Sequence, residues 1–96
     1  MTLLATMAVG LSACSYFRPY EQSFHSLGTE EGRAKYRMIG GYYGLAGSSY
    51  AEKHASLDSL LAGELKARGL CNKGFDIIYR GEYQGGGYLA TDALCR

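Results

Sequence analysis

The chain has 96 residues, which suits one domain with a single modest hydrophobic core. Its formal net charge is +1, from ten Lys and Arg and nine Asp and Glu, so no strong basic field favours a nucleic-acid partner. Fourteen glycines, nine tyrosines and one proline are typical of a domain with a sheet and glycine-rich turns. Polar and apolar residues alternate too closely for a disordered tail.

The first 13 residues, MTLLATMAVGLSA, form an uncharged apolar run that a cysteine follows. A helix needs about 20 apolar residues to cross a bilayer, so this run is too short to span one and is typical of a signal peptide. It ends in Leu11-Ser12-Ala13-Cys14. All four positions match the lipobox of bacterial lipoproteins, which reads Leu, a small residue, Ala or Gly, then Cys. The chain therefore resembles a lipoprotein precursor.

The resemblance implies cleavage of the signal peptide, residues 1–13, and attachment of acyl chains to Cys14. More than one acyl chain, at about 0.8 kcal/mol per buried CH₂, anchors a protein stably to a membrane. In lipoproteins a residue other than Asp after the cysteine commonly goes with transfer to the outer membrane, and here Ser15 follows. We expect an outer-membrane location facing the periplasm. The alternative is a buried helix or strand over residues 1–13, with Cys14 as a core thiol.

Residues 14–34 show neither the helical nor the strand period and contain the only proline, so we interpret them as a lipidated N-terminus and tether. Residues 35–96 then form the folded domain. Residues 35–43 predict a strand, with Tyr36, Met38 and Tyr42 on one face.

The next segment, residues 50–68, predicts a helix with both ends marked. Ser49 and Glu52 have the spacing of a capping box, and Gly69 is a typical residue to end a helix. Its apolar stripe consists of leucines 57, 60, 61 and 65. Two further strands, residues 75–80 and 88–94, are joined by a turn that contains Gly85-Gly86-Gly87. The order strand, helix, strand, strand predicts an α+β fold in which one helix covers one face of a three-stranded, mainly antiparallel sheet.

Cys71 and Cys95 lie at the two ends of this predicted hairpin, where antiparallel pairing brings them together. If the protein is exported, its compartment is oxidising and favours a disulfide. With Cys14 assigned to lipid, an even pair remains. A metal site at these two cysteines is the weaker alternative, since no histidine or further cysteine flanks either of them.

No residue pattern predicts catalysis, a cofactor or a metal site. His25 falls in the tether, and His54 falls at the margin of the helix's apolar stripe, where a packed histidine is commoner than a general base. The glycines and serines of residues 44–49 precede a helix but lack a P-loop lysine, so a phosphate site is a weak alternative.

The tyrosines are too many to be buried in so small a core, so several are expected on the uncovered face of the sheet. Exposed tyrosine is typical of recognition surfaces. The candidates for partner binding are Tyr36, Tyr42, Tyr79, Tyr83 and Tyr88. We therefore expect a structural or protein-interaction module of the cell envelope that is not an enzyme. The alternative is an inhibitor or accessory subunit of an envelope enzyme or secretion machine.

Overall fold

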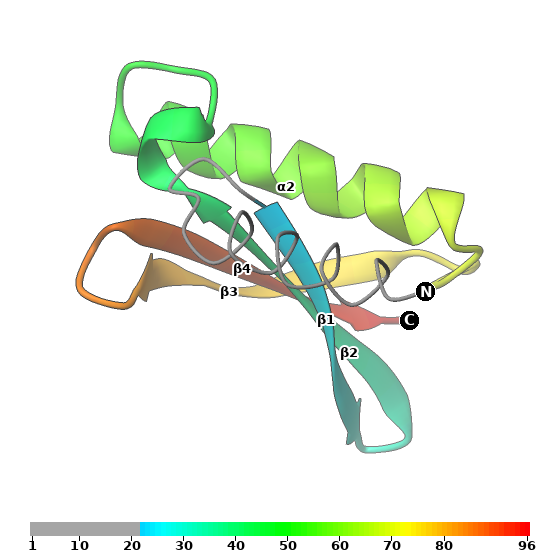
Figure 1. Ribbon diagram of the computed structural model, residues 1–96. Helices are drawn as coiled ribbons and strands as arrows, with labels where there is room; N and C mark the ends of the chain where they lie inside the picture. Colours follow the sequence, from blue (N-terminus) through cyan, green and yellow to red (C-terminus); the bar gives the residue numbers. More distant parts are fainter. Residues whose placement is uncertain (1–21) are drawn as a thin grey trace, which may run out of the picture.

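The computed structural model describes residues 22–96, which form one helix packed on one face of a sheet (Figure 1). Every neighbouring pair of strands is antiparallel, and the spatial order is β1-β2-β4-β3. Along the chain the elements are β1 (Gln22–Glu30), β2 (Arg33–Gly41), the short 3₁₀ helix η1 (Tyr42–Gly44), α2 (Tyr50–Ala67), β3 (Phe75–Tyr83) and β4 (Tyr88–Cys95).

The α+β class and the single helix are confirmed, but the prediction of three strands is wrong by one. The additional strand, β1, lies within the segment interpreted as a tether. It is an edge strand that pairs only with β2, and most of its side chains are exposed, so its sequence lacks the apolar alternation of a half-buried strand. Phe24 is half-buried, and its ring stacks on Tyr36 of β2 with centroids 5.4 Å apart.

The hydrophobic core lies between α2 and the two central strands. Leu57, Leu61 and Leu65 project from α2 and are essentially inaccessible to solvent. The sheet meets them with side chains of β2 and β4, chiefly Met38 and Leu89. Gly40 sits directly under the helix, since a Cβ there would lie 3.0 Å from a methyl carbon of Leu57.

Both ends of α2 follow the signals in the sequence. The Ser49 hydroxyl accepts a hydrogen bond from the Glu52 amide at 3.1 Å, and the Glu52 carboxylate accepts one from the Ser49 amide at 3.3 Å. At the other end Gly69 has a φ of 70°, and the Leu70 amide donates to the Leu65 carbonyl at 2.8 Å. This is a Schellman motif, in which a left-handed glycine closes the last turn.

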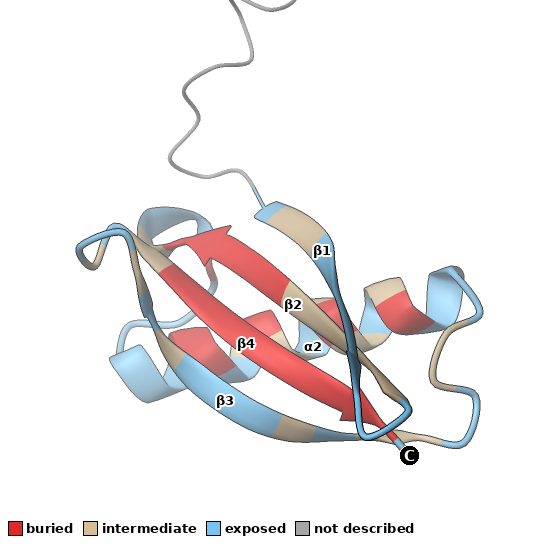
Figure 2. Ribbon diagram, turned by 90° about the horizontal axis from the view of Figure 1, so that it is seen from below, coloured by how far each residue is buried: buried red, intermediate tan, exposed pale blue. Residues whose placement is uncertain are grey.

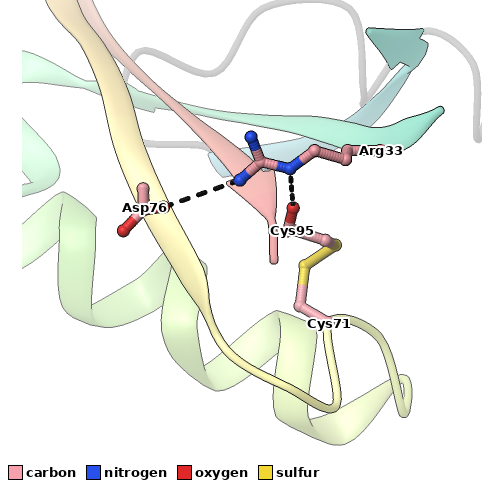
Figure 3. Close-up of a disulfide and its surroundings, with 4 residues drawn as sticks. All are labelled: Arg33, Cys71, Asp76 and Cys95. Atoms are coloured by element: carbon pink, nitrogen blue, oxygen red, sulfur yellow. Dashed lines mark hydrogen bonds and ion pairs between the residues drawn. A yellow bond between two sulfur atoms is a disulfide. The ribbon is translucent and has the colours of Figure 1, made fainter. Parts of the chain in front are cut away.

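The predicted disulfide between Cys71 and Cys95 is present (Figure 3). It joins the turn after α2 to the end of β4, and Cys95 pairs with Phe75 of the neighbouring strand. Arg33 of β2 strengthens the same corner, because its Nε donates to the Cys95 carbonyl at 2.8 Å while its guanidinium lies 3.6 Å from Asp76. The C-terminal end of β4 is thus held by covalent and polar links to three other segments.

Candidate binding surface on the open face of the sheet

The face of the sheet that points away from α2 carries a group of aromatic and charged side chains, which we call the tyrosine face: Arg37, Tyr79, Tyr83, Tyr88 and Asp92. Figure 2 shows this side of the sheet, with α2 behind it. The strand register brings the residues together. Arg37 pairs with Asp92, Asp92 pairs with Tyr79, and Tyr83 pairs with Tyr88.

A bulge in β3 is needed to place Tyr79 there. Ile77 pairs with Ala93, whereas Tyr79 pairs with Asp92, so Ile78 is an extra residue in the ladder. Ile77 packs against the core beneath α2. In a regular strand Tyr79 would share that face with Ile77, and the bulge moves it to the opposite one.

An ion pair between Arg37 and Asp92 occupies the middle of the tyrosine face. The Arg37 Nε and Nη2 atoms donate to the two Asp92 carboxylate oxygens at 2.7 and 2.9 Å. Asp92 is 5 % exposed, so its charge is almost removed from water. The hydrogen bond to Asp92 raises the pKa of the Arg37 guanidinium above its usual value, against the opposing effect of burial. This two-point pairing fixes the plane of the guanidinium.

Two tyrosines of β3 lie beside that guanidinium. The central carbon of the Arg37 guanidinium is 5.9 Å from the centre of the Tyr79 ring and 6.0 Å from the centre of the Tyr83 ring. The Tyr79 ring lies back over Gly81, where a Cβ atom would collide with its hydroxyl group. Glycine at position 81 therefore allows the ring to lie along the strand. The result is a shallow aromatic surface around a fixed cation.

The five predicted partner-binding tyrosines divide into two groups. Tyr79, Tyr83 and Tyr88 share the tyrosine face, and Tyr79 is 45 % exposed. Tyr36 instead stacks on Phe24 beside the core. Tyr42 lies in η1, where its ring is 4.6 Å from the Lys53 ammonium of α2 and its carbonyl accepts a hydrogen bond from that group at 2.9 Å.

Sequence reasoning missed Arg37 and Asp92 as members of this surface. They are 55 residues apart, and only the pairing of β2 with β4 makes them neighbours. The only indication in the sequence was that each is a charged residue within a predicted strand. A charged side chain in a strand is normally predicted to be exposed to solvent. Its burial against an opposite charge depends on the register between two strands, which the sequence of one strand does not reveal.

A second polar cluster lies between α2 and β3. His54 and Asp58 of α2 line a pocket there together with Arg80 of β3. The Thr91 hydroxyl beside this cluster is fully buried and donates to Asp58 at 2.7 Å, so it is not placed to attack a substrate.

Cys14 and the predicted signal peptide lie outside the described residues. Within residues 22–96, no helix is both long and apolar enough to cross a bilayer. The same part of the chain contains no group of three or more His, Cys, Asp or Glu side chains that could hold a metal ion.

Comparison of this chain with protein-family models, curated proteins and solved structures finds no match. We therefore infer its function from its own residues and their geometry.

Proposed function

We propose that this protein is a lipid-anchored lipoprotein of the bacterial cell envelope that binds a protein partner through the tyrosine face. The lipobox at residues 11–14 supports the anchor. The disulfide between Cys71 and Cys95 fits an oxidising compartment, which an exported protein reaches. In this proposal the protein has no catalytic activity of its own and acts as a structural or interaction module.

The observation that carries partner binding is the combination of one exposed tyrosine, Tyr79, and two half-buried ones, Tyr83 and Tyr88, with a fixed arginine on a sheet face that α2 does not cover. Tyrosine and arginine are enriched among residues that dominate binding energy, because they offer large contact areas with polar ends. The Arg37 guanidinium is already oriented by Asp92, so binding costs little further ordering of that side chain.

The chemistry of the tyrosine face favours a neutral partner surface rich in hydrogen-bond acceptors. Both Asp92 oxygens accept from Arg37, so the pair has no net charge and offers no free acidic group. The groups left to bind a partner are phenol hydroxyls and the remaining N–H groups of Arg37. We therefore expect apolar side chains and main-chain carbonyls of the partner to meet this face.

Site-specific crosslinking tests the proposed surface. A photoreactive phenylalanine analogue at position 83 should give a covalent adduct of one defined mass in intact cells. The same analogue in place of Ser59, which is exposed on α2, should give none. Arg37→Met should lower the yield from position 83 at least tenfold, the effect of losing a binding hot spot. Equal yields from positions 83 and 59, or no effect of Arg37→Met, would refute binding by this face.

Metabolic labelling tests the anchor independently. A palmitate analogue should label the wild-type protein and the control variant Ser15→Ala, whereas Cys14→Ser should lose the label and accumulate uncleaved. Labelling that persists in Cys14→Ser would contradict the lipoprotein assignment. It would not affect the proposed binding surface, which the crosslinking experiment tests separately.

A further inference from the structure

His54 is a buried histidine whose ring lacks a full set of hydrogen bonds. It lies on α2 and is 6 % exposed, with its ring edge-on to Tyr50 at a centroid distance of 4.8 Å. Its Nδ1 atom is inaccessible to solvent and has no hydrogen-bond partner among the described residues. A buried polar atom without a hydrogen bond lowers the free energy of unfolding, so such atoms are uncommon in folded proteins.

One turn further along α2, Asp58 makes a polar link from the helix to the sheet. Its Oδ2 atom accepts from the Arg80 Nε and Nη2 atoms at 2.9 and 2.7 Å, and its Oδ1 atom accepts from the Thr91 hydroxyl at 2.7 Å. We call Asp58, Arg80 and Thr91 the Asp58 clamp. The Asp58 carboxylate thus links the edge strand β3 to α2. A second cation close to this carboxylate would compete with Arg80 for it.

The ionisable groups around His54 come from two elements. On α2 they are Tyr50 and Asp58, and on β3 they are Arg80 and, beside Tyr50, Glu82. The positions of β4 that pair with Arg80 and Glu82 are Thr91 and Leu89, which do not ionise.

Burial lowers the pKa of His54 below its usual value; Asp58 partly opposes this shift and Arg80 adds to it. His54 is therefore neutral at pH 7, and uptake of a proton places two cations beside one clamp carboxylate. A pocket of about 330 Å³, lined by His54, Asp58 and Arg80 with Ala51 and Ala55, opens beside the ring and gives protons a route to it.

We propose that the Asp58 clamp is proton-responsive: protonated His54 takes Asp58 as its partner, and Arg80 is released into solvent. The Arg80 side chain is half-exposed already, so its guanidinium can be hydrated with little rearrangement, whereas His54 is buried. Like charges on His54 and Arg80 favour the exchange. Acid thus detaches β3 from α2 at this point. The inference does not depend on any partner of the tyrosine face.

Solution NMR of the full chain in detergent tests this exchange. As the pH is lowered from 8 to 4.5, the Arg80 Nε–Hε signal should move to the position of a free guanidinium with the same midpoint as the His54 ring. The Arg96 guanidinium, which is ion-paired with Asp76, serves as the internal control. The Arg96 signal should stay constant over the same pH range.

Two variants complete the design. In Asp58→Asn the Arg80 signal should occupy the free position already at pH 8, and in His54→Gln it should keep its bound position down to pH 5. An Arg80 signal that stays constant through the His54 titration would overturn the proposal. So would a transition in which all arginine signals shift together, because that is global unfolding. The wild-type titration decides the matter even if a variant fails to fold.

Discussion

The two faces of β4 are both buried, but by different kinds of side chain. Toward α2, Leu89 and Ala93 lie under the leucines of the helix. On the opposite face Ala90 and Leu94 are equally inaccessible, yet the residue between them is the acidic Asp92, paired with Arg37 and flanked by Tyr79. The helix face excludes water mainly with aliphatic groups, and its buried Thr91, between Leu89 and Ala93, is hydrogen-bonded to Asp58 of α2. The tyrosine face excludes water with amphipathic groups whose polar ends remain available. We therefore assign stability chiefly to the helix face and the proposed partner recognition to the tyrosine face.

The helix face should contain the largest single-residue contribution to stability. Leu61→Ala removes a fully buried side chain and should lower the free energy of unfolding by about 2–5 kcal/mol, as measured by urea denaturation. Leu27→Ala on the exposed edge strand is the matched control and should change it by less than about 0.5 kcal/mol. Similar losses in both variants would mean that the core is not where the structure places it.

The disulfide between Cys71 and Cys95 should make the next largest contribution to stability. Replacing both Cys71 and Cys95 by serine opens a crosslink between residues 24 apart, and the loss should be about 3 kcal/mol. Unfolding of the wild type in the presence of a reductant should reproduce that loss, while the double variant should not respond to reductant. A wild-type protein indifferent to reductant would contradict the disulfide's contribution.

On the tyrosine face, removing one partner of the Arg37–Asp92 ion pair should lower stability more than removing both. Arg37→Met leaves the buried Asp92 carboxylate without its partner and should cost about 1–3 kcal/mol. The double variant Arg37→Met with Asp92→Leu should recover most of that loss, because no unpaired charge remains. If the double variant is no more stable than Arg37→Met alone, the loss does not come from an unpaired charge, and the two faces are less different than we argue.

Lowering the pH should reduce the free energy of unfolding because His54 takes up a proton. A base whose pKa is lower in the folded state binds fewer protons there than when unfolded. Its contribution to stability is therefore complete above about pH 6.5, the ordinary pKa of histidine, and is lost as the pH falls from there through the lowered folded value. Denaturation at a series of pH values should show a slope for the wild type in this window that is smaller in His54→Gln. Equal slopes would place the pH dependence elsewhere.

The smallest effect on stability should come from Gly81→Ala. The new Cβ would occupy the space of the Tyr79 hydroxyl, so the ring must swing off the strand, at a cost within about 1 kcal/mol because both residues are on an edge strand. Crosslinking from position 83 should nevertheless fall sharply, since the aromatic surface is displaced. Undiminished crosslinking would show that the orientation of Tyr79 is irrelevant to binding.

How much of this could be predicted from the sequence depended on whether the signal was local. The ends of α2 and the pairing of Cys71 with Cys95 followed from short-range patterns, and both are confirmed. The edge strand β1 was missed because it buries almost no side chain, and the face of Tyr79 could not be foreseen because the bulge at Ile78 reverses the alternation. The ion pair of the tyrosine face depends on register across two strands, which no local pattern contains.

The most direct test of recognition by the tyrosine face is tyrosine iodination, read by mass spectrometry, in intact envelopes and in the purified protein. Tyr79 and Tyr83 should be modified in the purified protein and protected in the envelope. Tyr43 is 75 % exposed in the 3₁₀ turn, away from this face, and should react equally in both. Protection of Tyr79 and Tyr83 that is lost in Arg37→Met would support the account. Equal reactivity of Tyr79 and Tyr83 in envelope and purified protein would contradict it.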